Sequence, residues 1–183
     1  MENREKMYKI DGMITVDDLL DYNKYYYKST LNTVKNKVLL SIFVVIVFIL
    51  AFYDVSRLMD GKIDIYEMKS IYIILYLILF VLIVKHLVVK SVKKLYNSNA
   101  FYHEQQKIIV SEKEITCSSE SSCVKLTENK IKKICITDKA IYVYISTVQA
   151  YIITKQMVGN NDKYNEIANY IKDNFFQSKI IFE

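Results

Sequence analysis

Two long stretches without a charged residue constrain this chain more than any other feature. One runs from Val38 to Tyr53 and the other from Ser70 to Val84, so they contain 16 and 15 residues. Neither stretch has a polar stripe, and a helix formed by either would be apolar on every side. Such a helix belongs in a large hydrophobic core or in a lipid bilayer.

The size of the chain and the residues that flank the two stretches favour the bilayer. At about 1.5 Å per residue the stretches give roughly 24 and 22 Å of helix, less than the ~30 Å hydrocarbon core. Flanking apolar residues, and lysines that extend toward headgroups, lengthen each helix to about 20 residues. A chain of 183 residues can hardly cover two such helices. We therefore predict a transmembrane helical hairpin over residues 34–94, with spans at about 36–55 and 70–89.

Lysines are concentrated next to the spans but outside the loop that joins them. The loop from Asp54 to Lys69 has three basic and four acidic residues. Cytoplasmic segments carry the excess of Lys and Arg, so we expect both termini to be cytoplasmic. The lysines that indicate this are Lys24, Lys28, Lys35 and Lys37 before the first span, and Lys85, Lys90, Lys93 and Lys94 after the second.

Residues 1–33 are expected to form a cytoplasmic strand and an amphipathic helix. The pattern predicts an extended piece at Tyr8–Ile10, a turn at Asp11-Gly12, and a helix with Thr15 as its N-cap. Its apolar side fits two arrangements. The helix can lie in the membrane interface, or it can pack on the C-terminal domain and lead into the first span.

Residues 95–183 have the pattern of a β-rich domain with a C-terminal helix. Short runs rich in valine, isoleucine, threonine and tyrosine are separated by turn-forming or charged pairs, which favours an antiparallel meander. Apolar residues at helical spacing then predict a helix over Asp162–Phe176. The predicted strands are Lys107–Ser111, Glu114–Ser118, Ser122–Leu126, Lys130–Thr137, Ala140–Ser146 and Val148–Thr154.

The stretch from Lys130 to Met157, with Tyr-Val-Tyr at 142–144, resembles the C-terminal domain of YcxB-like membrane proteins. The order of an N-terminal segment, two spans and a C-terminal β-rich domain is also similar to that family. The matching motif positions are Tyr142, Tyr144, Ile153 and Lys155.

The resemblance implies a fold similar to pleckstrin-homology domains, and it implies no activity. The chain departs from the family pattern at Thr154, where proline is frequent, and at Leu126 or Thr127, where tryptophan is common. The expected fold class is therefore an α+β membrane protein. It combines a two-helix transmembrane hairpin with a cytoplasmic, pleckstrin-homology-like antiparallel β-domain and a C-terminal helix.

The chain offers little material for catalysis, so we predict no enzyme activity, no cofactor and no metal site. His86 and His103 are its only histidines, and its three glycines cannot form a phosphate-binding loop. The spacing of Cys117, Cys123 and Cys135 matches no zinc or redox motif. A hairpin centred on Glu120 would place Cys117 opposite Cys123 and permit a redox-sensitive bridge. The alternative is that all three cysteines are reduced, half-buried strand residues.

Two groups of basic residues are the candidate contacts for lipid headgroups. The first is Lys85, Lys90, Lys93 and Lys94, each worth about 1 kcal/mol next to anionic lipid. The second surrounds a predicted strand and its turn and contains Lys130, Lys132, Lys133 and Lys139. On the strand, Lys130 and Lys132 share one face and Lys133 points the other way. Both groups also fit a role in topology or simply a solvated surface.

These features together predict a non-enzymatic, two-span protein of the bacterial plasma membrane. We expect its cytoplasmic domain to bind a protein partner or anionic lipid headgroups. The net charge of +5 is too small to require nucleic acid, and we predict none as a partner. An alternative is an oligomeric transport or channel component, which the absence of ionisable residues within the spans disfavours. A soluble enzyme with a buried hairpin is the third class.

Overall fold

The computed structural model describes residues 6–65 and 68–182 of the chain, which is an α+β protein with two long apolar helices. These residues divide into two compact units, which we name the helical unit and the β-rich unit. The helical unit spans residues 23–93, and the β-rich unit lies within residues 1–22 and 94–183. The division falls inside two helices, so each of these helices contributes to both units.

The first of these helices, α1 (Val16–Leu31), begins with the predicted N-cap. The backbone N–H of Asp18 donates to Thr15 Oγ1 at 3.2 Å, and the Asp18 carboxylate accepts from the backbone N–H of Thr15 at 2.8 Å. This reciprocal pair satisfies donors that a helix start would otherwise leave without partners. The predicted helix start is therefore confirmed.

Two helices make up most of the helical unit, α2 (Val34–Met59) and α3 (Lys69–Ser98). Both are long and apolar enough to cross a bilayer, with mean hydropathy of 2.8 and 2.6 in their most apolar parts. The backbone N–H of Ser70 donates to the Asp54 carboxylate at 2.7 Å, which joins the start of α3 to α2. Elsewhere the apolar side chains of both helices are mostly exposed.

The first sheet of the β-rich unit joins the N-terminal strand to the C-terminal part of the chain. Its order is β1-β2-β3-β4, and all of its pairings are antiparallel. Gly12, the last residue of β1, lies opposite Gln106, the first of β2, so residues 13–105 form one insertion between two neighbouring strands. The strands are β1 (Tyr8–Gly12), β2 (Gln106–Val110), β3 (Glu114–Ser118) and β4 (Cys123–Thr127).

The second sheet has the order β7-β6-β5-β8 and contains one parallel pair. Strand β8 lies parallel to β5, with Ile134 opposite Ile180. Neither this strand nor a parallel pairing was predicted from the sequence. The other pairings are antiparallel, as expected for a meander. The strands are β5 (Lys133–Ile136), β6 (Ala140–Tyr144), β7 (Ala150–Thr154) and β8 (Ile180–Phe182).

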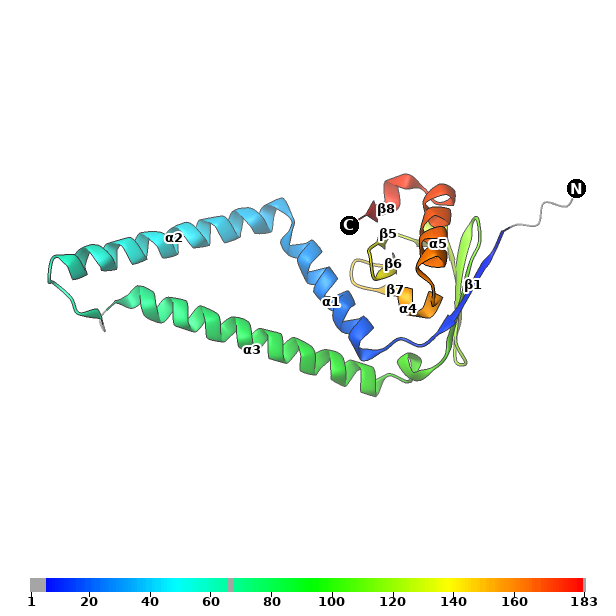
Figure 1. The fold of residues 1–183 in the computed structure, drawn as a ribbon, viewed down its shortest axis with the longest axis horizontal. Coiled ribbons are helices and arrows are strands. Elements are labelled where there is room, and N and C mark those ends of the chain that lie inside the picture. The colour runs from blue at the N-terminus through cyan, green and yellow to red at the C-terminus, as the bar shows by residue number, and fades with distance from the viewer. Residues whose placement is uncertain (1–5, 66–67, 183) are drawn as a thin grey trace, which may run out of the picture. The chain divides into compact units, whose positions relative to one another are not determined.

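The two sheets and helix α5 (Asn161–Asn174) enclose the hydrophobic core of the β-rich unit (Figure 1). The short helix α4 (Lys155–Val158) precedes α5, and Gly159 separates the two with a φ of 77° that favours glycine. Strand β6 is buried along its whole length because Ile141 and Val143 enter this core while Tyr142 packs against Tyr22 of α1. The four predicted apolar positions that lie on α5, which are Tyr164, Ile167, Ala168 and Ile171, are all buried.

The predicted elements differ from the structure mainly at their ends. The strand expected over Lys130–Thr137 starts only at Lys133, because residues 128–130 form a 3-10 turn. Lys130 and Lys132 therefore do not share a strand face, and that prediction is wrong. Helix α5 ends at Asn174; Phe175 beyond it is buried, whereas Phe176 is exposed.

Candidate functional site

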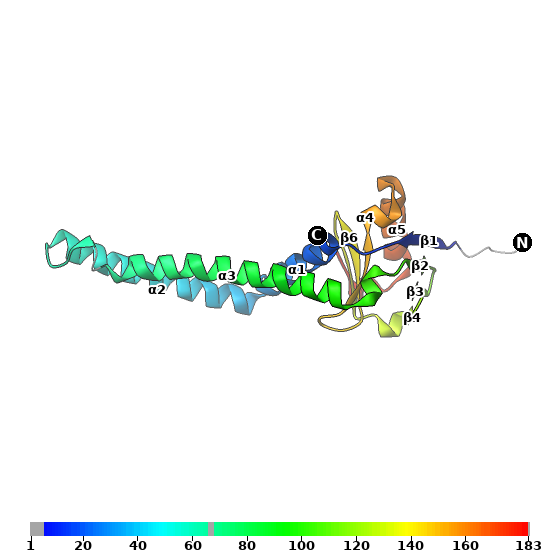
Figure 2. The same ribbon diagram turned by 90° about the horizontal axis from the view of Figure 1, so that it is seen from below.

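The four lysines predicted to follow the second span all lie on the last four turns of α3, which is one continuous helix (Figure 2). Lys85, Lys90, Lys93 and Lys94 have exposed side chains. At about 100° of rotation per residue they spread over one half of the helix circumference. The structure thus gathers these four residues into a basic face of α3.

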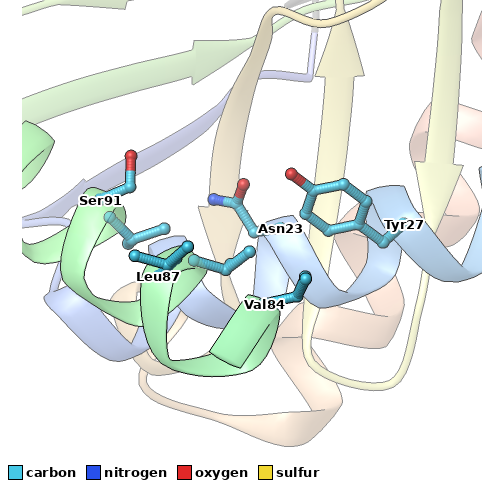
Figure 3. Close-up of a pocket in the computed structure, with 7 residues that line it drawn as sticks. Asn23, Tyr27, Val84, Leu87 and Ser91 are labelled. Atoms are coloured by element: carbon cyan, nitrogen blue, oxygen red, sulfur yellow. The ribbon is translucent and has the colours of Figure 1, made fainter. Parts of the chain in front are cut away.

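The opposite half of α3 lines a small groove with the second half of α1 (Figure 3). The groove has a volume of about 280 Å³, near the lower end of the range for small-molecule sites. Figure 3 shows the polar ends of Asn23, Tyr27 and Ser91 along one rim, with Val84 and Leu87 on the other side. We call this site the interfacial groove, and its lining residues are Asn23, Tyr27, Val84, Leu87, Val88, Ser91 and Val92.

The interfacial groove was not predicted from the sequence. Asn23 and Tyr27 are four residues apart and therefore share one face of α1, a spacing that can be read from the sequence. The pairing of that face with α3 cannot be read from periodicity, because the two helices are separated by the whole of α2.

The second group of predicted lysines does not form one patch in the β-rich unit. Lys130 ends the 3-10 turn, where its ammonium donates to the backbone oxygen of Lys125 at 3.5 Å. Lys132 is exposed in the following link, and Lys133 lies over the ring of Tyr144 at 4.3 Å. Lys139 pairs with Asp21 of α1 at 2.6 Å, which raises its pKa through the hydrogen bond to that carboxylate.

The positions that carry the family resemblance serve packing. Tyr142, Tyr144 and Ile153 are buried, and the ring of Tyr22 lies 5.4 and 6.0 Å from the rings of the two β6 tyrosines. Burial raises the pKa of Tyr142 to about 12, so its phenol stays protonated at neutral pH. Lys155 starts α4 and lies 5.6 Å from the ring of Tyr164.

Thr154, where the resemblance implies proline, has a capping function in this chain. Its hydroxyl oxygen accepts from the backbone N–H of Met157 at 3.1 Å, which caps α4. A hydroxyl at this position thus satisfies a donor at the helix start. Replacing it by proline would remove that interaction.

The strand register does not bring Cys117 and Cys123 together. Cys117 pairs with Val124, and Cys123 pairs with Ser118, so the hairpin is offset by one residue from one centred on Glu120. A shift of one residue turns a side chain to the other face of a sheet. Cys117 is accordingly buried in the core and Cys123 is exposed, so the condition for a bridge between them, a hairpin centred on Glu120, is not met.

This arrangement predicts that only one thiol of the folded chain reacts with a maleimide. Burial raises the pKa of Cys117 to about 12, and the thiolate is the reactive form. Cys135 is also buried, which leaves the exposed Cys123 as the reactive residue. Mass spectrometry should count one adduct on the native protein and three after denaturation. Fast labelling of a native Cys123→Ser variant would contradict the assignment.

No metal-binding arrangement occurs among the residues that the structure describes. Nowhere in residues 6–65 and 68–182 do three or more His, Cys, Asp or Glu side chains gather closely enough to hold an ion. His86 is exposed on α3, and the ring of His103 lies 4.5 Å from that of Tyr96.

Comparison with protein-family models, with curated proteins and with solved structures finds no match to this chain.

Proposed function

We propose that this chain is a two-span integral membrane protein that holds its β-rich unit at the cytoplasmic surface of a bacterial plasma membrane and binds anionic lipid headgroups there. The observation that carries this proposal is the contrast in burial between the two units. Large apolar side chains are exposed along α2 and α3, whereas the β-rich unit buries its own in a core shared by two sheets and α5. Exposing so much apolar surface to water is energetically unfavourable, whereas the hydrocarbon core of a bilayer accommodates it.

The pairing of β1 with β2 supports the proposed topology. Residues 8–12 precede both long helices and residues 106–110 follow them, yet they form neighbouring strands. Two strands of one sheet must lie on the same side of a membrane. An even number of crossings between them meets this requirement, and the two candidate spans supply it.

The distribution of charge supports the proposed orientation and the proposed ligand. Residues 23–37 and 84–94, which flank the spans on the side of the β-rich unit, contain eight lysines and no acidic residue. The loop at the other end has an excess of acidic residues. Lysines near a surface rich in anionic lipid each contribute about 1 kcal/mol of attraction.

The proposal includes a relationship of this chain to YcxB-like proteins and a pleckstrin-homology-like fold for its β-rich unit. They are supported by the two mainly antiparallel sheets and the C-terminal helix that packs on them. The parallel strand β8 is an addition to the predicted meander.

Cysteine labelling of the full chain tests the topology. We expect a membrane-impermeant maleimide to label the exposed Cys123 in inverted vesicles and not in intact cells. In a Cys123→Ser background, a cysteine placed at the exposed Met59, at the end of α2, should show the reverse pattern. Labelling of both positions from the same side, or release of the protein by alkaline carbonate, would refute the two-span arrangement.

A further inference from the structure

We propose that the interfacial groove between α1 and α3 binds one anionic phospholipid molecule. The methylenes of an acyl chain would lie on Val84, Leu87 and Val88, and the phosphate would lie at the rim formed by Asn23, Tyr27 and Ser91. This inference rests on the proposed function, because the groove can hold a lipid only if α3 crosses the bilayer.

The position of the groove along α3 fits an amphipathic ligand. At about 1.5 Å per residue, Val84 lies roughly 21 Å and Val92 roughly 33 Å along the helix from Ser70. The hydrocarbon core is about 30 Å thick, so a span that enters at Ser70 leaves the hydrocarbon between these two residues. The groove therefore passes from acyl-chain depth to headgroup depth, and it is continuous with the lipid-facing surface of α3.

The lining has an aliphatic side and a polar rim. Val84, Leu87, Val88 and Val92 are aliphatic, whereas Ser91 supplies a hydroxyl at the rim. Figure 3 shows the Asn23 amide and the Tyr27 hydroxyl on the same rim as Ser91. Hydroxyl and amide groups donate hydrogen bonds to phosphate oxygens, and aliphatic side chains provide contact area for methylenes.

Charge complementarity favours an anionic lipid over a zwitterionic one. The groove is formed by two segments that are free of Asp and Glu, residues 23–37 and 84–94. Lys24 is exposed next to Asn23 on α1, and the basic face of α3 lies at the same depth on the far side of that helix. An anionic headgroup at the rim therefore has Lys24 beside it and further lysines at the same depth on the far side of α3, and no carboxylate from either segment repels it.

Native mass spectrometry of the full chain tests the proposal. The protein is reconstituted into vesicles of equal parts phosphatidylcholine and phosphatidylglycerol, released in mild detergent, and weighed with its retained lipid. The wild type should retain one phosphatidylglycerol. Val88→Phe and Ser91→Phe fill the groove and should lower this retention about tenfold, which corresponds to about 1.4 kcal/mol of binding free energy.

The matched control is His86→Phe, which introduces the same ring on the exposed face of α3 two residues from Val88 and about 200° away around the helix. It should retain the lipid as the wild type does. Lys24→Gln should lower the preference for phosphatidylglycerol over phosphatidylcholine. If Val88→Phe impairs folding, Ser91→Phe decides the result, because Ser91 is exposed and tolerates a larger side chain.

Three results would overturn the groove assignment. They are equal retention by wild type, Ser91→Phe and His86→Phe; equal retention of the two lipid classes by the wild type; and no retained lipid in any sample. If the protein stays in carbonate-washed membranes and gives any of these results, the lipid site in the groove is refuted and the two-span topology stands. If carbonate extracts the protein, both proposals are refuted.

Discussion

Replacing Ile10 by aspartate is expected to unfold the β-rich unit, although the helical insertion separates β1 in the sequence from the other strands of the core. Ile10 is only 2% exposed and pairs with Ile108 of β2. Truncating a buried isoleucine to alanine costs about 2–5 kcal/mol, and a buried carboxylate without a partner adds its desolvation. The sum approaches the whole stability of an ordinary domain, about 5–15 kcal/mol.

Limited trypsin digestion of the full chain in vesicles measures this effect. The wild-type β-rich unit should resist cleavage, and the Ile10→Asp unit should be cut at many lysines. Lys9→Asp is the matched control, because it places the same side chain on the same strand at an exposed position. Its effect should stay within the range of about 1 kcal/mol that strand propensities cover. Equal resistance of the two variants would mean that β1 does not belong to this core.

The local elements could be predicted because each depends on residues close together in the chain. The N-cap at Thr15, the two apolar helices, six of the eight strands within one or a few residues, and the apolar face of α5 follow from spacing and turn chemistry. Strand β1 was predicted as a short extended piece, but its partner was not. Pairing across residues 13–105 has no local signal, because any strand with the same alternation would fit β2 equally well.

The details of the candidate sites depend on strand register, turn geometry and helix packing, which the composition of the chain does not determine. The turn between β3 and β4 sets a register that differs by one residue from that of a hairpin centred on Glu120. Because of this difference, Cys117 pairs with Val124 instead of Cys123. Glu128 begins a 3-10 turn, so β5 starts only at Lys133, and Lys130 and Lys132 lie outside the strand. The interfacial groove depends on the approach of α1 to α3, which is a tertiary contact between two helices whose individual patterns give no register.

Placing arginine at the middle of both spans is expected to abolish stable insertion. Val45 and Ile78 lie near the centres of the two apolar stretches, and each is 55% exposed. On insertion scales, an arginine at the centre of a span costs about 2.5–3.5 kcal/mol, and the replaced aliphatic residue contributed a few tenths in the opposite direction. The Val45→Arg, Ile78→Arg double variant should therefore lose roughly 6 kcal/mol or more of insertion free energy, and alkaline carbonate should release it from membranes.

An arginine at Val148 separates the effect of depth in the bilayer from the effect of charge. Val148 is as exposed as the two span residues, at 56%, but it lies in the turn between β6 and β7. Because a solvated turn accepts a charge at little cost, Val148→Arg should remain in the carbonate pellet like the wild type. In a soluble protein with an exposed hairpin, the three positions would be equivalent and the double variant would be more soluble without further change. Unequal behaviour of residues with equal exposure therefore identifies the solvent around α2 and α3 as lipid.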